Sequence, residues 1–182
     1  MSYLVKSGEY ELAYKQFNRA KCMSDQLSSF QMLVENHNPY QKEVIERFYQ
    51  LHSEDAQVMD RWFSVQSISP STSVAGIREL MSHKLFTMTN PNRIRSVFGA
   101  FTQNHIQFHC QEGYQLMTEV IIKLDALNPQ IAARFASVFN HWKRFTSHYS
   151  KLQETELKTI SEVDNLSNDV YEIVHIALEG RT

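Results

Sequence analysis

Residues 88–101 read Met-Thr-Asn-Pro-Asn-Arg-Ile-Arg-Ser-Val-Phe-Gly-Ala-Phe and contain the signals of a helix start. Asn90 is a favoured N-cap residue, and Pro91 suits the first helical position because its missing N–H is not needed there. The apolar residues that follow recur at the spacing of one helical face: Ile94, Val97, Phe98 and Phe101. The stretch therefore predicts an amphipathic helix that begins at residue 90.

Apolar residues follow helical spacing in nearly all of the remaining chain. About ten helices are predicted, over residues 9–20, 24–35, 40–52, 53–67, 72–83, from 90 onward, 113–125, from 128 onward, 150–163 and 167–178. All four prolines fall between these helices or in a first turn, where helix geometry tolerates them. Because short connections imply antiparallel neighbours, we expect an all-α fold of stacked antiparallel helical hairpins. The hairpins can form a superhelical array, which we prefer, or an irregular bundle, with no domain boundary inside residues 1–182.

The composition fits a helical protein. At 182 residues and 42% hydrophobic, the chain can bury a core as a single domain. It has only five glycines and four prolines, which argues against an all-β protein with its many turns. A formal charge of −2 argues against general nucleic-acid binding. The small basic cluster at residues 141–148 is explained by the dipole at the end of a helix.

The sequence also indicates a compartment. Cys22 and Cys110 form no disulfide framework and are expected to be free thiols in a reducing environment. Residues 1–8 lack the apolar stretch of a signal peptide, and no run reaches about 18 consecutive apolar residues. We therefore expect a cytoplasmic protein without a membrane partner.

Motifs of catalysis are missing from the sequence. The zinc-peptidase signature H-E-x-x-H does not occur, nor do G-x-S-x-G, the P-loop or G-x-G-x-x-G. His105 and His109 lie four apart, with Cys110 adjacent, a spacing that superficially resembles metal ligands. No second half-site accompanies them, so we interpret them as ordinary surface histidines. No catalytic residue, metal site or cofactor is predicted for this chain.

Two arginines of the opening stretch suggest a binding site. On a helical wheel, Arg93 and Arg95 flank the apolar stripe on opposite sides, while Ser96 faces away from it. Arginines near a helix N-terminus oppose the helix dipole unless an anion uses them together with the free N–H groups. Alternatively, their stems follow the edge of the core and their heads lie in solvent. Arg134 flanks the stripe of its helix in the same way. On the residues alone we favour the solvent-exposed alternative.

Segments spread along almost the whole chain match one known family in order. They are KQF at 15–17, MSD at 23–25, VMDRWF at 58–63, SP at 69–70, FTMTNPNRIRS at 86–96, GAF at 99–101, NPQIA at 128–132 with Arg134, KR at 143–144, and NLS at 165–167 with Asp169, Tyr171 and Glu172. In these segments the chain resembles aminopeptidase N of the bacterial type, a zinc metallopeptidase family. The string Asn90-Pro91-Asn92-Arg93-Ile94-Arg95 is the most specific of them.

The resemblance implies which part of such an enzyme this chain represents. Members of the family have an N-terminal β domain, a thermolysin-like catalytic domain, a small β-sandwich and a helical C-terminal domain. The chain resembles the distal part of the helical domain, and because Met1 falls partway into it we expect a fragment. The family's zinc ligands and general base have no matching positions here. The chain alone is therefore expected to be inactive, with zinc held elsewhere in the parent enzyme.

The resemblance also implies a role. In the family, the helical domain closes over the catalytic domain, caps the internal cavity that holds the substrate and limits access to short peptides. Arg95 and Arg134 match arginines that line this cavity, whereas Arg93 is expected to form a structural ion pair. The implied partners are the catalytic domain of the same enzyme and its peptide substrates. The competing hypothesis is a free-standing helical-repeat adaptor whose concave face binds a partner peptide.

Overall fold

The structure, a computed structural model, describes residues 10–180, and all regular secondary structure in that range is helical. Its α-helices are α2 Tyr10–Arg19, α3 Met23–Val34, α4 Gln41–His52, α5 Ala56–Ile68, α6 Val74–Met81, α7 Pro91–Ile94, α8 His105–Phe108, α9 Gln111–Asp125, α10 Pro129–Ala136, α11 Ser147–Ser161 and α12 Asn168–Glu179. A π-helical turn, η1 Arg95–Gly99, continues α7, and two 3-10 turns, η2 Ser137–Phe139 and η3 Trp142–Arg144, follow α10. The expected fold class is confirmed.

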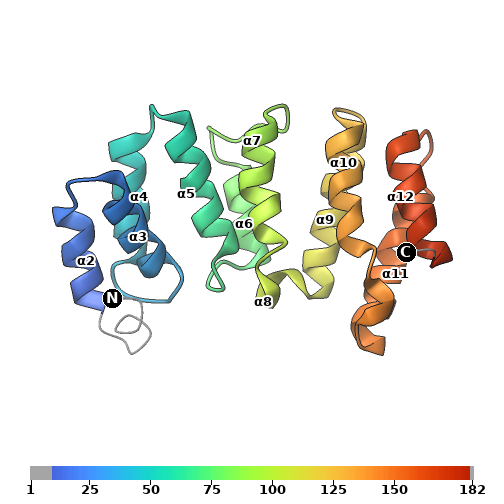
Figure 1. The fold of residues 1–182 in the computed structure, drawn as a ribbon, viewed down its shortest axis with the longest axis horizontal. Coiled ribbons are helices and arrows are strands. Elements are labelled where there is room, and N and C mark those ends of the chain that lie inside the picture. Colours follow the sequence, from blue (N-terminus) through green and yellow to red (C-terminus); the bar gives the residue numbers. More distant parts are fainter. Residues whose placement is uncertain (1–9, 181–182) are drawn as a thin grey trace.

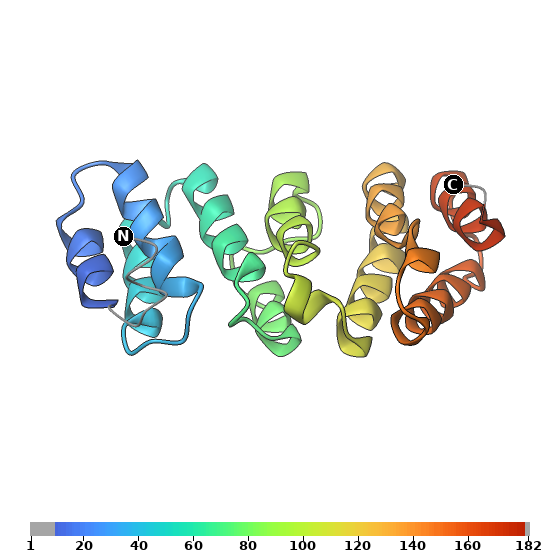
Figure 2. The same cartoon turned by 60° about the horizontal axis from the view of Figure 1, so that its bottom comes forward.

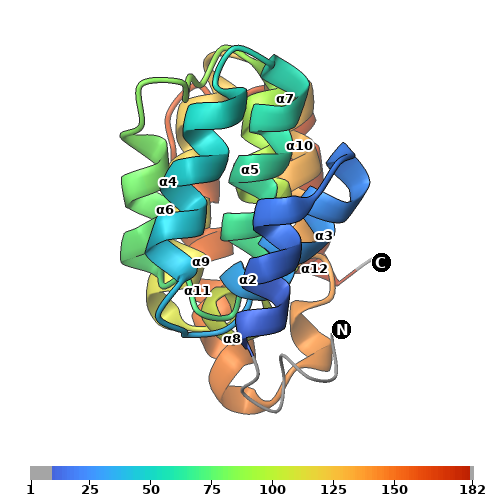
Figure 3. The ribbon, with the colours of Figure 1, turned by 90° about the vertical axis from the view of Figure 1, so that its left-hand side faces the viewer.

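The helices are stacked side by side along one long axis, from α2 at one end to α12 at the other (Figure 1). Viewed along that axis they form two layers, with α4, α6, α9 and α11 in one layer and α3, α5, α7–η1, α10 and α12 in the other (Figure 3). Figure 2 shows the successive hairpins α4–α5, α6–α7, α9–α10 and α11–α12 as an extended array rather than a globule. The superhelical array is therefore the correct alternative.

A row of aromatic rings joins neighbouring hairpins through the middle of the array. The centroids of Phe63 and Phe86 are 6.4 Å apart, those of Phe86 and Phe98 5.9 Å, and those of Phe98 and Phe135 6.3 Å. Two of these contacts are edge-to-face, a geometry that aromatic pairs prefer. The row connects α5 with η1 and α10, the three segments that form the candidate site.

The connection that follows α5 is held from two sides. The Ser69 hydroxyl is fully buried and donates to the carbonyl oxygen of Val34 at the end of α3, at 2.7 Å. The Asn104 side-chain amide donates to the carbonyl oxygen of Ser69 at 2.6 Å. Because buried backbone carbonyls need partners, these bonds fix the end of α5 between α3 and α8.

The structure differs from the expected helices in three respects. A short helix, α8, lies just before the helix predicted over 113–125 and was not predicted, and the Asn104 side chain caps it by accepting from the Gln107 N–H. The helix predicted from residue 128 onward ends at Ala136, and 3-10 turns follow it. The helix that begins at residue 90 changes to π-helical geometry at Arg95.

No helix within residues 10–180 is both long enough and apolar enough to cross a membrane.

Candidate functional site

The helix start at Asn90 forms as predicted, with a consequence for the expected anion site. The Asn90 side chain accepts from the N–H groups of Asn92 and Arg93 at 3.0 and 3.2 Å, and its carbonyl oxygen accepts from the N–H of Ile94 at 3.0 Å. Pro91 occupies the first helical position and has no N–H. The first-turn donors are therefore already used. The hypothesis that an anion binds them together with the arginines is wrong.

Arg93 is buried and paired, which confirms the structural ion pair expected for it. Only 5% of Arg93 is exposed, and its Nε lies 3.4 Å from Oδ1 of Asp60 on α5. Its guanidinium carbon lies 4.6 Å from the ring centre of Phe63, within range of a cation–π interaction. Burial lowers the pKa of Arg93 and the charge of Asp60 opposes that shift. The alternative that this arginine projects into solvent is wrong.

Arg93 is buried because α5 covers its side of the helix that begins at Asn90. Ser96, which the wheel turned away from the apolar stripe, is also buried, and its hydroxyl donates to the carbonyl oxygen of Arg93 at 2.9 Å. A helix inside a layer has neighbours on both sides as well as one beneath it. A single apolar stripe therefore underestimates how much of the helix is buried.

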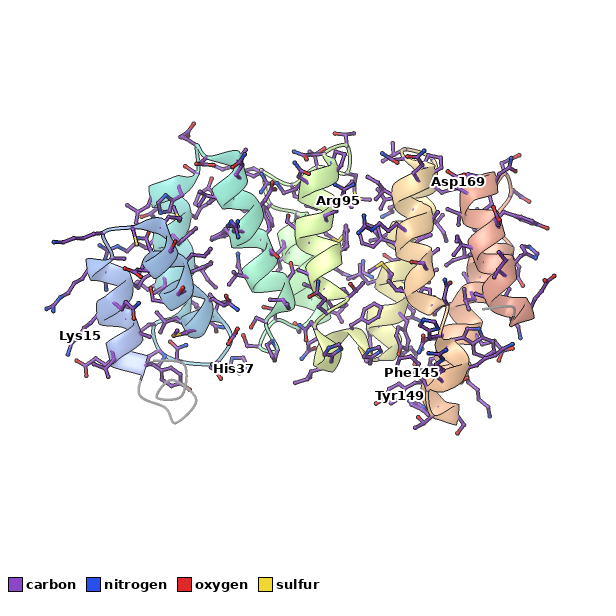
Figure 4. All side chains as sticks on the ribbon, viewed as in Figure 1. Lys15, His37, Arg95, Phe145, Tyr149 and Asp169 are labelled. Carbon is purple, nitrogen blue, oxygen red and sulfur yellow. The ribbon has the colours of Figure 1, made fainter. Side chains whose placement is uncertain are left out.

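Arg95 and Arg134 are exposed, and they line the same pocket between η1 and α10. Figure 4 labels Arg95 near the upper end of the central helix of the array. The pocket has a volume of about 430 Å³ and is open to solvent. Its lining consists of the two arginines with Ser64, Ile68, Gly99, Ala100, Thr102, Gln103, Ile131, Phe135 and Val138. Two arginines that are distant in the sequence thus line one pocket.

Part of the pocket lining is ordered by side-chain hydrogen bonds to one carbonyl oxygen. The Thr102 hydroxyl and the Gln103 side-chain amide both donate to the carbonyl oxygen of Gly99, at 2.9 and 3.2 Å. Gly99 is the last residue of the π-helical turn that begins at Arg95. Turns of this kind leave carbonyl groups without their usual partner and occur often at functional sites. Nothing in the sequence signals this turn, so sequence reasoning missed it.

The three segments around the pocket carry an excess of positive charge. Helices α5, α7–η1 and α10 together contain four arginines and one acidic residue, Asp60, whereas the whole chain has a formal charge of −2. Asp60 is already paired with Arg93. Within residues 10–180, no acidic group forms an ion pair with Arg61, Arg95 or Arg134. A second hollow of about 500 Å³ adjoins the pocket and shares Ser64 and Arg95 with it.

The other residues considered from the sequence have structural partners. Nδ1 of His109 lies 2.8 Å from the hydroxyl of buried Tyr114, and burial lowers the pKa of His109. The His105 and His109 rings are stacked with their centres 6.0 Å apart. The Cys110 thiol accepts from the Gly113 N–H at the start of α9. In the part of the chain that the structure describes, no three His, Cys, Asp or Glu side chains are arranged to hold a metal ion.

The basic cluster after α10 also contains a buried residue that anchors it to the fold. Trp142 is buried, and its indole N–H donates to the carbonyl oxygen of Ala177 at 3.0 Å, which attaches the segment to α12. Cys22 and Cys110 are both free thiols, as expected.

Comparison with known proteins identifies the class to which this fold belongs. Residues 1–179 match the family described as "Domain of unknown function (DUF3458_C) ARM repeats". ARM repeats are stacked helical units of the kind seen here. The chain therefore belongs to this family of helical-repeat domains.

Its relatives are bacterial aminopeptidases. The chain is 34% identical to Aminopeptidase N of Escherichia coli (strain K12) over 171 residues, and 34% identical to Aminopeptidase N of Haemophilus influenzae over 172 residues. Each alignment covers 92% of this chain and 20% of the relative. A solved structure of Legionella pneumophila aminopeptidase A in complex with aspartic acid superposes with a TM-score of 0.90 at 28% identity, covering 95% of this chain and 21% of that one.

The chain is thus homologous to the C-terminal helical region of aminopeptidases and spans about a fifth of the length of these relatives.

Proposed function

We propose that this chain is the non-catalytic helical part of a cytoplasmic zinc aminopeptidase that removes N-terminal residues from short peptides. In this role the array caps the active-site cavity and restricts which substrates enter. Arg95 and Arg134 face the cavity and interact with the part of the peptide distant from the scissile bond. Its partners are then the catalytic domain of the same enzyme and peptide substrates.

The observation that carries the proposal is the meeting of Arg95 and Arg134 in one pocket. A guanidinium pairs strongly with carboxylates and with peptide carbonyl groups. The surrounding helices carry unpaired positive charge, which attracts the negative end of a peptide. The chain is homologous to aminopeptidases, and in such an enzyme an arginine-lined surface can bind the peptide substrate.

Residues 10–180 of this chain do not fit a catalytic zinc centre. Such a centre needs about three protein ligands and an open position, and the described residues offer no cluster of that kind. We therefore assign the zinc and the chemistry to a part of the enzyme that precedes this region.

The alternative is an adaptor that works alone and binds a peptide on the same surface. The array geometry supports it, because stacked repeats often present extended binding surfaces. The two proposals differ in whether an adjoining catalytic domain is required.

One experiment separates them. The purified chain is assayed with added zinc, and then mixed with E. coli aminopeptidase N that lacks the matching region. We expect no hydrolysis by the chain alone and a gain of peptide hydrolysis in the mixture. Robust activity of the isolated chain contradicts the non-catalytic role, and a mixture without any gain favours the adaptor.

The role of the arginines is tested in the complemented enzyme. Arg95→Ala should weaken the hydrolysis of tripeptides more than that of single-residue chromogenic substrates, because only the tripeptide reaches the pocket. Arg144→Ala is the matched control, since Arg144 is exposed and lies outside the pocket. Equal losses on both substrate types would indicate a packing role instead.

A further inference from the structure

A second pocket, of about 460 Å³, lies between α4 and α6, which belong to the same layer (Figure 3). The Gln41 side-chain amide at the start of α4 donates to the Ser71 hydroxyl, just before α6, at 2.8 Å. Beyond the other end of α6, the His83 ring meets the Tyr49 ring of α4 edge to face, with centroids 5.2 Å apart. The two helices therefore run in the same direction, and both begin at one end of the pocket. None of the residues that line this pocket lines the one with the two arginines.

The two helices place charges of opposite sign on this pocket. Lys42, in the first turn of α4, and Glu79, more than one turn into α6, both line it and are exposed. Among residues 10–180, neither side chain forms an ion pair with the other or with any further group. The dipoles of both helices add positive potential at the end where Lys42 lies. The pocket is therefore polarised along its length.

A buried glutamine of α5 adds an unused acceptor to the lining. Gln66 is 8% exposed, and its Nε2 donates to the carbonyl oxygen of Trp62 at 3.0 Å. Because only the amide nitrogen can donate to a carbonyl, this bond fixes which side-chain atom is Oε1. That oxygen accepts no hydrogen bond from residues 10–180. Buried polar atoms normally have a partner, so a ligand with N–H groups fits beside Gln66.

The remaining lining extends the same polarity. At the positive end the Ser73 hydroxyl accepts from the Gly76 N–H, so its own proton is free to donate. Ile45, one turn after Lys42, and Leu80, directly after Glu79, form an apolar part of the wall. His83 also lines the pocket, and burial lowers its pKa, so it adds no second positive charge at neutral pH.

The charges decide which class of ligand fits. A phosphate ion is attracted by Lys42 but repelled by Glu79, and for a simple amine the signs are reversed. A neutral sugar leaves both charges without a partner. A free amino acid carries an ammonium group and a carboxylate on one carbon atom, next to its side chain. A peptide has the same two end groups, but each added residue moves them about 3.5 Å farther apart.

From these features we infer that the pocket between α4 and α6 is a binding site for a free α-amino acid with an aliphatic side chain. Its carboxylate pairs with Lys42 and accepts from the Ser73 hydroxyl. Its ammonium group donates to Glu79 and to Oε1 of Gln66, and its side chain packs against Leu80. The inference goes beyond the proposed function and does not depend on it, because binding requires only this chain.

The test measures dissociation constants of the complete 182-residue chain by NMR titration. The probes are leucine, N-acetyl-leucine, leucinamide and glycine. Acetylation removes the ammonium group and amidation removes the carboxylate, so these two derivatives also imitate the last and the first residue of a peptide. Each should bind at least about fivefold more weakly than leucine, because one charge-assisted pair is lost. Glycine should also bind at least about fivefold more weakly, because it has no side chain to bury.

Variants locate the binding. Lys42→Gln should abolish the preference for leucine over leucinamide, and Glu79→Gln should abolish the preference over N-acetyl-leucine. Lys151→Gln and Glu172→Gln are the matched controls and should retain both preferences, since these residues lie outside the pocket. All four residues are exposed, so the variants should fold, and circular dichroism verifies this. Ala75→Trp fills the pocket without a change of charge and should weaken leucine binding at least about 10-fold.

Four results would overturn the inference: no binding of leucine at millimolar concentration, equal affinity for leucine and its two derivatives, preferences that survive both charge variants, or leucine binding that is unaffected by Ala75→Trp. Failure of the proposed enzyme role is recognised separately. If the mixture with truncated aminopeptidase N stays inactive while the preference for leucine persists, the amino-acid site stands without the enzyme.

Discussion

Replacing Arg93 by alanine should destabilise the fold far more than the same change at Arg95, two residues away. Arg93 is 5% exposed, lies 3.4 Å from the Asp60 carboxylate and contacts the ring of Phe63. Removing one partner of a buried ion pair costs about 3–5 kcal/mol. The Asp60 side chain keeps 24% exposure and stays partly hydrated, so we take the lower end, about 3 kcal/mol.

For a chain of this size, such a loss lowers the melting temperature by about 6–12 °C. The exposed Arg95 has no ion-pair partner among residues 10–180, so Arg95→Ala should change stability by less than about 0.5 kcal/mol. Both variants are compared with the parent chain by urea unfolding, followed by circular dichroism at neutral pH.

A double-mutant cycle identifies the source of the effect. Asp60→Ala combined with Arg93→Ala should cost less than the sum of the single changes, by about 1–2 kcal/mol, because the two residues share one interaction. If Arg93→Ala is as mild as Arg95→Ala, Arg93 is not the buried half of an ion pair and the assignment of separate roles to the two arginines fails.

Three further predictions concern the scaffold. Asn90→Ala and Asn128→Ala should each cost about 1 kcal/mol in urea unfolding, because each side chain caps a helix; a loss near zero would contradict the caps. Gly113→Ala should be strongly destabilising, since a Cβ there would lie 2.4 Å from a backbone carbonyl oxygen. Gly99→Ala, where a Cβ would lie 3.9 Å from the Arg95 side chain, should be nearly neutral, and equal effects at the two glycines would refute this. Burial raises the pKa of Tyr114 from 10.0 to about 12, so its contribution to stability is complete below pH 10 and is lost as the pH rises toward 12. Absorbance titration at 295 nm should show a late tyrosine ionisation that is lost in Tyr114→Phe.

The features that could be predicted from the sequence are those that depend on local interactions. Asn90-Pro91 and Asn128-Pro129 start helices because the cap and the fixed proline angle act within one turn. Helical spacing of apolar residues likewise predicted the all-α fold. The stacking order followed from the short connections between helices.

The features that could not be predicted depend on segments far apart in the chain. Arg93 and Arg95 both flank the apolar stripe. Arg93 is buried only because α5 packs against its side of the helix. The meeting of Arg95 with Arg134 depends on two hairpins packing side by side. The resemblance to aminopeptidase N singled out the same two arginines as lining a cavity, but it did not give the apolar wall or the π-helical turn.

The two arginines of the pocket belong to different hairpins, since η1 pairs with α6 and α10 pairs with α9. The distance between the two arginines therefore depends on how the two hairpins are stacked rather than on the geometry of either helix. In a stacked array, a small rotation between neighbouring units changes that distance without breaking any unit. The segment that contains α8 joins the two hairpins. We therefore expect its conformation to influence the separation of the two arginines. A substitution within α8 itself would alter how well a ligand fits while leaving every residue that lines the pocket unchanged.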